Sequence, residues 1–168
     1  GNLTGSAGND DLTILGAQLD ALVFGGGIID FDGGFDVINL TSTSLNLNTL
    51  GGIDGSINNL EFIDATTAAA GVTIDMSGQT EGFLGITGSA NNDTLIGGAG
   101  GDIITGGDGD DIITGNAGSD TADYFNAGAG VTVNLNTTIA QNTVGAGTDT
   151  ITCVENLEGS QFDDILTG

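Results

Sequence analysis

Short apolar runs alternate with polar turn residues along the whole chain of 168 residues. Alternating stretches that predict β-strands are VINL at 37–40, LNL at 45–47, LEFI at 60–63, VTIDM at 72–76 and VTVNLN at 131–136. Runs rich in Gly, Asn, Ser and Thr separate them and predict turns. We find no sustained helical periodicity, and proline, which would remove hydrogen bonds from a sheet, is absent. The pattern therefore predicts an all-β protein of short strands.

Four consecutive nine-residue units occupy the middle of the chain. They are GSANNDTLI at 88–96, GGAGGDIIT at 97–105, GGDGDDIIT at 106–114 and GNAGSDTAD at 115–123. The sixth position is always aspartate: Asp93, Asp102, Asp111 and Asp120. The eighth position is always apolar: Leu95, Ile104, Ile113 and Ala122. Because nine is neither a helical nor a strand period, each unit must contain a turn and a short strand, and the units must stack as a solenoid.

Each position of the unit has a physical role. Glycine at positions one, two and four allows positive φ and can aim successive carbonyls at one point, where the aspartate supplies charge. The residue at position eight points inward, so stacked coils bury a ladder of apolar side chains about 4.8 Å apart. Looser copies keep this frame at 5–13, 31–39, 144–152 and 159–167. Their sixth positions are weaker metal-binding candidates: Asp10, Asp36, Asp149 and Asp164.

The tight repeats divide the chain into three parts. We expect N-terminal β-solenoid coils with degenerate repeats at 1–87, the repeat segment at 88–123 and C-terminal coils with degenerate repeats at 124–168, together forming one continuous domain. The segment Gly130 to Asn136 is similar to Gly71 to Ser77, which indicates wider coils on either side of the tight ones.

The charge of the chain is entirely negative. Asp and Glu total 23, and there is no Lys, Arg or His, so side chains cannot form ion pairs with one another. A compact state with a net charge of −23 repels itself, which makes bound metal cations the first candidates for neutralising it. Binding to nucleic acid or anionic lipid is disfavoured, because those partners attract Lys and Arg. No apolar run reaches the ~18 residues of a transmembrane helix, so we expect no membrane insertion.

The composition also argues against an enzyme. No His, Lys or Arg can act as a base, an activated amine or an oxyanion clamp. Cys153 has no His to activate it, and in TITCVENL we interpret it as a small core residue of a strand. One catalytic alternative stays open: an aspartate pair beside Tyr124 that processes polysaccharide on a β-helix.

The central units resemble the calcium-binding nonapeptide GGXGXDXUX of the RTX (repeats-in-toxin, hemolysin-type) family, where U is a large aliphatic residue. The resemblance is strong over 88–123 and weaker elsewhere. It implies a parallel β-roll with calcium-binding turns, here flanked by wider β-helical coils, in which successive nonapeptides lie on opposite sides. A calcium ion would then bind between units eighteen residues apart. An EF-hand beginning at Asp108 is excluded, because Ile112 stands at its fifth position and no glutamate closes the loop.

The resemblance also implies two ligand sets. The first comprises the carboxylates of Asp93 and Asp111 with the carbonyls of Ser89, Asn91, Gly106 and Asp108. The second comprises the carboxylates of Asp102 and Asp120 with the carbonyls of Gly98, Gly100, Gly115 and Ala117. Six hard oxygens suit Ca²⁺. Without calcium the stacked aspartates repel, so folding should need the ion. The side chains of Asp108, Asp110 and Asp123 are expected to lie outside, in solvent.

Two functions remain open. The first is a secreted, extracellular structural protein of a bacterial filament, surface layer or matrix, in which the last coil of one copy stacks on the first coil of another with calcium at the junction. The second is the carrier and folding module of a larger type I secreted toxin, enzyme or adhesin. The chain begins at Gly1 rather than Met and ends on a repeat fragment, so we expect it to be processed or excised from a longer protein.

Overall fold

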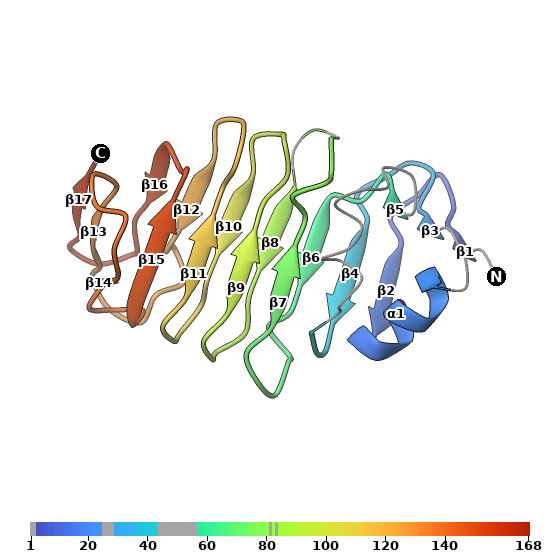
Figure 1. Ribbon diagram of the computed structural model, residues 1–168, viewed down its shortest axis with the longest axis horizontal. Coiled ribbons are helices and arrows are strands. Elements are labelled where there is room, and N and C mark those ends of the chain that lie inside the picture. Colours follow the sequence, from blue (N-terminus) through green and yellow to red (C-terminus); the bar gives the residue numbers. More distant parts are fainter. Residues whose placement is uncertain (1–2, 25–28, 44–56, 81, 83) are drawn as a thin grey trace.

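Short strands stacked along one long axis dominate the protein (Figure 1). The computed structural model describes residues 3–24, 29–43, 57–80, 82 and 84–168. The coils near the N-terminus lie at one end of the stack and those near the C-terminus at the other. The strand predicted at 45–47 lies outside the described residues.

A parallel sheet of seven strands runs through most of the described chain. In spatial order its strands are β16 (Asn156–Glu158), β12 (Thr121–Asp123), β10 (Ile103–Thr105), β8 (Gly85–Thr87), β6 (Phe62–Asp64), β4 (Val37–Leu40) and β2 (Asp11–Ile14). All neighbouring strands in it are parallel. The sheet therefore joins coils from residue 11 to residue 158 in one ladder.

A five-stranded sheet lies on the opposite side of the coils (Figure 1). Its strands are β7 (Thr73–Asp75), β9 (Thr94–Ile96), β11 (Ile112–Thr114) and β15 (Thr148–Thr152), which are parallel, and β14 (Gln141–Asn142), which is antiparallel to β15. Two smaller parallel sheets complete the described strands: β1 (Leu3–Thr4), β3 (Ile29–Asp30) and β5 (Ile57–Asn58) in one, and β13 (Thr132–Asn134) with β17 (Ile165–Thr167) in the other.

Successive nonapeptides alternate between the two large sheets, as predicted for a β-roll. Strands β9 and β11 belong to the five-stranded sheet, whereas β10 and β12 belong to the seven-stranded one. The register places Leu95 opposite Ile113 and Ile104 opposite Ala122, which are pairs separated by eighteen residues. Two nonapeptides thus make one coil of the solenoid.

The core is built from the eighth positions of the units. The seven-stranded sheet aligns one buried column: Ile38, Ile63, Ile86, Ile104 and Ala122. The five-stranded sheet aligns a second: Ile74, Leu95, Ile113 and Ile151. Ile104 and Ile113 belong to the same apolar cluster, so the columns meet between the sheets. Burying each such side chain stabilises the fold by about 1.5–3 kcal/mol.

A helix that the sequence pattern did not predict interrupts the N-terminal coils. Helix α1 (Gly16–Phe24) follows β2. The Gln18 side chain accepts a hydrogen bond from the Leu15 N–H (3.2 Å), as in a capping box, and Leu19 is fully buried in the core. Nine residues make too few turns for a helical period to stand out from the sequence. No helix within the described ranges is long and apolar enough to cross a membrane.

Cys153 is exposed, so its interpretation as a core residue was wrong. Strand β15 ends at Thr152, and Cys153 adopts a left-handed backbone conformation with φ of 52°. The chain therefore turns at Cys153, and its side chain leaves the alternation that keeps Ile151 buried.

The neighbours Ile112 and Ile113 test the inward orientation of position eight. Ile113 is 1% exposed and Ile112 is 47% exposed. Replacing Ile113 with Ala should lower the free energy of unfolding by about 2–4 kcal/mol, because it leaves a cavity. Replacing Ile112 with Ala should lower it by less than about 1 kcal/mol. Urea unfolding followed by circular dichroism measures both; equal losses would contradict the assigned register.

Candidate metal centre

Buried carboxylates connect neighbouring coils in the repeat segment. The backbone N–H of Asp93 donates a hydrogen bond to Asp111 Oδ1, and that of Asp102 donates to Asp120 Oδ1, both at 2.8 Å. All four side chains are at most 2% exposed. The structure thus brings together the two aspartate pairs that the resemblance to RTX repeats implied. The first pair lies beside the five-stranded sheet and the second beside the seven-stranded sheet, and we call these N–H to carboxylate hydrogen bonds together the carboxylate ladder.

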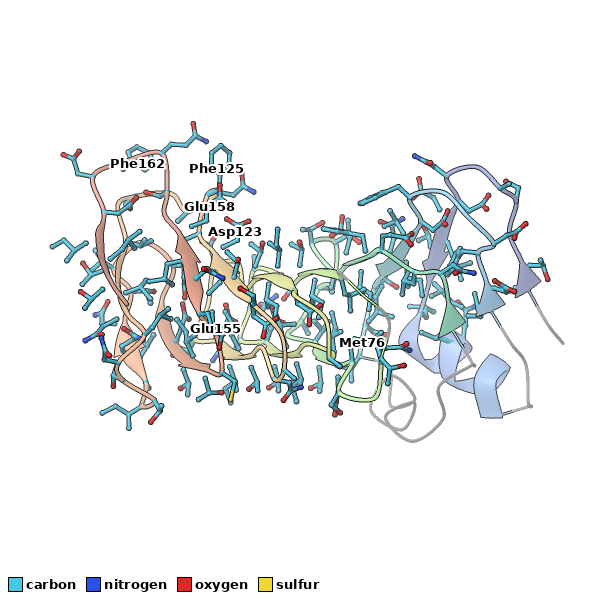
Figure 2. The ribbon with its side chains drawn as sticks, turned by 90° about the horizontal axis from the view of Figure 1, so that it is seen from above. Met76, Asp123, Phe125, Glu155, Glu158 and Phe162 are labelled. Atoms are coloured by element: carbon cyan, nitrogen blue, oxygen red, sulfur yellow. The ribbon has the colours of Figure 1, made fainter. Side chains whose placement is uncertain are left out.

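The carboxylate ladder continues beyond the repeats through two glutamates that the sequence analysis missed. The N–H of Asp36 donates to Glu61 Oε2 (2.9 Å), and the N–H of Asp120 donates to Glu155 Oε2 (3.0 Å; Glu155 is labelled in Figure 2). Each glutamate directly precedes a strand, as each repeat aspartate does. An acidic residue immediately before an alternating apolar run was the signal, and it lacked the glycines of the nonapeptide.

The two turns of each aspartate pair differ in conformation. In the first turn the position-two N–H donates to the aspartate of its own unit: Ser89 to Asp93 Oδ2 and Gly98 to Asp102 Oδ2, both at 2.7 Å. In the second turn the position-two residue has positive φ instead: 106° for Gly107 and 73° for Asn116. In the second type of turn the position-two amide therefore points away from the aspartate of its own unit.

The second turns leave buried oxygens without hydrogen bonds. Across the described residues, three buried side-chain oxygens have no hydrogen-bond partner: Asp36 Oδ2, Asp111 Oδ2 and Asp120 Oδ2. Each predicted calcium site of the repeat segment contains one of them. A buried carboxylate oxygen with no donor is costly unless a cation or a proton compensates it. The donor set at these turns therefore fits a metal ion.

The first glycine of each unit is required by the close approach of two predicted ligands. A Cβ atom at Gly88 would lie closer than 3.0 Å to both Asp93 Oδ2 and the Gly106 carbonyl oxygen. A Cβ atom at Gly97 would likewise approach Asp102 Oδ2 and the Gly115 carbonyl oxygen. These oxygens thus gather at one corner of the coil, which any larger side chain would fill.

The remaining predicted carbonyls lie along the same turns. The carbonyls of Ser89, Asn91 and Gly100 face glycines of the next coil, each within 3.0 Å of where a Cβ would stand. Of the other three predicted carbonyl ligands, Gly98 is buried in the first turn of the second pair, and Asp108 and Ala117 are exposed in the second turns. Among the residues that the structure describes, no three Asp, Glu or Cys side chains converge on one point. An ion here would therefore depend on backbone carbonyls as well as on the paired carboxylates.

Departures from the glycine consensus are accommodated locally. The Ser89 hydroxyl donates to both oxygens of Asp93 (3.1 and 3.2 Å). Asn116 takes the positive φ that asparagine tolerates, and its Nδ2 donates to the Gly97 carbonyl at 2.8 Å. The outward aspartates are placed as expected for Asp108 and Asp110, which are exposed, while Asp123 is half-buried and accepts from Thr105 Oγ1 (3.0 Å).

Two of the weaker candidates have their oxygens engaged by the protein. Asp149 is buried; its Oδ1 accepts from the Asp111 N–H, and its Oδ2 accepts from the buried Tyr124 hydroxyl at 2.8 Å. Burial, reinforced by the Asp149 charge, raises the pKa of Tyr124. Asp164 Oδ1 accepts from Ser160 Oγ (2.7 Å) and the Val131 N–H (2.8 Å), and these bonds lower the pKa of Asp164. Asp10 and Asp36 form an aspartate pair of their own in the N-terminal coils.

Burial makes the repeat aspartates weak acids in the metal-free chain. It raises the pKa of Asp102 to about 6, with the Asp120 charge adding to the effect, and that of Asp111 to about 7, where the charges of Asp149 and Asp93 contribute. Burial also raises the pKa of Asp93 and of Asp120. These sites therefore attract positive charge at neutral pH.

Comparison with known families bears on the same residues. Residues 87–122 match the model of the RTX calcium-binding nonapeptide repeat, in four copies. This segment consists of RTX calcium-binding repeats. It contains both aspartate pairs, so the buried oxygens of Asp111 and Asp120 belong to motifs that bind Ca²⁺. No curated protein matches the chain.

The glycine corner of the RTX repeats can be tested directly. Replacing Gly97 with Ala should destabilise the calcium-loaded protein by about 2 kcal/mol, because the new methyl group collides with Asp102 Oδ2 and the Gly115 carbonyl. Gly128 has nothing within 4 Å of its Cβ position, so Gly128→Ala should change stability by less than about 0.5 kcal/mol. Thermal unfolding at fixed calcium compares the two; an unchanged Gly97→Ala protein would contradict the crowded corner.

The pH dependence of folding follows from the raised pKa values. Burial places the pKa of Asp102 at about 6 and of Asp111 at about 7 in the folded chain, against an ordinary value of 3.8. Protonation therefore stabilises the calcium-free fold at low pH, and this stability is lost as the pH rises through these values. In EGTA, the folded fraction measured by circular dichroism should fall between about pH 5 and pH 8.

Two controls accompany that titration. With saturating calcium the trend should reverse, because the ion binds the deprotonated carboxylates. In Asp111→Asn the part of the loss that occurs near pH 7 should disappear. A calcium-free folded fraction that rises with pH would show that these aspartates are not buried acids.

Proposed function

We propose that this protein is a secreted calcium-binding structural protein whose coils fold on calcium and associate end to end outside the cell. In this proposal one ion lies between the turns of Asp93 and Asp111, and a second between those of Asp102 and Asp120. Their carboxylates and the carbonyls of the glycine corners supply the ligands. Calcium thereby provides the positive charge that the chain lacks.

The observation that supports calcium-dependent folding most strongly is the unpartnered Oδ2 of Asp111 and of Asp120. Each is buried in a chain that contains no Lys, Arg or His. Extracellular calcium modules typically bind with dissociation constants on the order of 10⁻⁴–10⁻³ M, so such turns would stay empty in a cytosol and fill outside it. RTX repeat proteins are typically secreted, which agrees with this location.

The support for end-to-end association comes from the C-terminal coil. Among the described strands, β17 pairs with β13 alone, and its Ile165 and Leu166 are 66% and 42% exposed. A Cβ at Gly159 would collide with Asp164 Oδ2, so this turn has a glycine corner like those of the RTX repeats. At the other end of the stack Leu3 is 42% exposed.

Light scattering during a calcium titration from an EGTA start tests both parts of the proposal. We expect β-sheet circular dichroism and particle mass to rise together, and electron microscopy to show linear particles at millimolar calcium. Replacing Ile165 with Asp should abolish the rise in mass but keep the circular dichroism change, because it charges the end face.

A matched control is Phe125→Asp, which charges an exposed apolar residue that projects sideways from the stack (46% exposed; Figure 2) and should assemble normally. Monodisperse wild-type monomers that fold with calcium would overturn the assembly proposal and favour the carrier module of a larger secreted protein. Full β-sheet signal in EGTA at neutral pH would overturn calcium-dependent folding itself.

A further inference from the structure

The N-terminal coils repeat the architecture of the RTX aspartate pairs outside the segment that the RTX repeat matches. The turn of unit 5–13 lies below that of unit 31–39, and β2 pairs with β4 in register. The N–H of Asp10 donates to Asp36 Oδ1 at 2.6 Å, as the N–H of Asp93 donates to Asp111 Oδ1. The spacing here is 26 residues rather than 18, and the connection carries α1.

The lower turn at 5–13 has the conformation of the first turn of an RTX pair. The Ser6 N–H donates to Asp10 Oδ2 at 2.6 Å, as the Ser89 N–H donates to Asp93 Oδ2 at 2.7 Å. The Ser6 hydroxyl also lies against the Asp10 carboxylate (3.3 and 3.4 Å). The two turns thus present their aspartates to the next coil in the same way.

The upper turn at 31–39 has the conformation of the second turn. Asp32 and Gly34 both have positive φ (69° and 153°), at the positions that Gly107 and Gly109 occupy in the RTX unit. Asp36 is 0% exposed, and its Oδ2 has no hydrogen-bond partner. Within the described ranges, the three turns with positive φ at positions two and four are the three that carry an unpartnered buried aspartate oxygen.

Contacts between the two N-terminal turns also match. The Phe35 N–H donates to Asn9 Oδ1 (3.1 Å), as the Asp110 N–H donates to Asn92 Oδ1 (2.9 Å) in the RTX pair. A Cβ at Gly5 would approach both Asp10 Oδ2 and the Phe31 carbonyl oxygen within 3.0 Å. The same two oxygens have counterparts at the Gly88 corner, where Asp93 Oδ2 and the Gly106 carbonyl meet.

We infer that these two turns form a third calcium site. Its carboxylates come from Asp10 and Asp36, and its carbonyls from Ser6, Gly8, Phe31 and Gly33, the positions that correspond to the ligands proposed for the central sites. The choice of ion rests on the proposed function of those sites, whereas the site itself rests on the N-terminal geometry. Bound calcium would fasten the coil that carries α1 to the coil above it.

The geometry separates this pair from the other degenerate units. Asp149 Oδ2 is occupied by the Tyr124 hydroxyl, and Asp164 accepts from Ser160 and Val131. Asp36 Oδ2 has no such donor, so a bound cation would compensate the buried oxygen that the protein leaves without a partner.

Native mass spectrometry at saturating calcium tests the third site by counting ions. Asp36→Asn should bind one ion fewer than the wild type, because the amide keeps an acceptor for the Asp10 N–H but loses the charged oxygen. Asp11→Asn is the matched control: it removes the same charge from an exposed neighbour of Asp10 and should keep the wild-type count. An unchanged count in Asp36→Asn would overturn the inference.

Hydrogen exchange of the wild-type protein supplies a second measurement that does not depend on the folding of a variant. Calcium should slow exchange in peptides covering 5–14 and 31–40 by about tenfold or more. The same protection should persist in Asp111→Asn, which damages a central site instead. No change in these peptides, with protection confined to 88–123, would overturn the third site and leave the central sites standing. A wild type that binds no calcium at all would refute the proposed function instead.

Discussion

A buried aspartate that accepts the backbone N–H of the coil below is the interaction on which this structure depends. It fixes the height and register of each coil, because the donor is the residue that enters one strand and the acceptor is the residue that enters the next. It also brings negative charge into the interior of a chain with no basic side chain. The same hydrogen bonds that set the stacking of the coils therefore bury negative charge, which only protons or bound cations can neutralise.

The carboxylate ladder tolerates large changes in coil length. Its donor and acceptor are 18 residues apart in the RTX segment, but 26 apart for Asp10 and Asp36 and 38 apart for Asp111 and Asp149. The connecting loops differ accordingly, and one of them contains α1. What stays constant is a carboxylate directly before a strand or at its start, followed by an apolar residue two positions later. The length of a coil can therefore vary as long as the N–H to carboxylate hydrogen bond and the apolar residue of the following strand are kept.

The stacked units use two different turn conformations. One turns its position-two amide onto its own aspartate, and the other turns that amide away and leaves one aspartate oxygen without a donor. Glycine, asparagine or aspartate stands at position two of the second conformation, since positive φ strains most other side chains. A site therefore needs two different turns in neighbouring coils. An aspartate within a glycine-rich unit is not enough, as Asp149 shows, because its Oδ2 accepts a hydrogen bond from Tyr124.

The period of nine, with aspartate at position six and an aliphatic residue at position eight, was sufficient to predict stacked coils and inward apolar columns. The resemblance to RTX repeats implied the parallel β-roll and the eighteen-residue pairing of Asp93 with Asp111. These features are local, because each unit carries its own turn and strand. Tertiary structure decided the rest: that Glu61 and Glu155 join the carboxylate ladder, that Cys153 turns outward, and which aspartate oxygens lack a donor. Those outcomes depend on which residue the neighbouring coil brings alongside, and loops of varying length set that neighbour without leaving a pattern in the sequence.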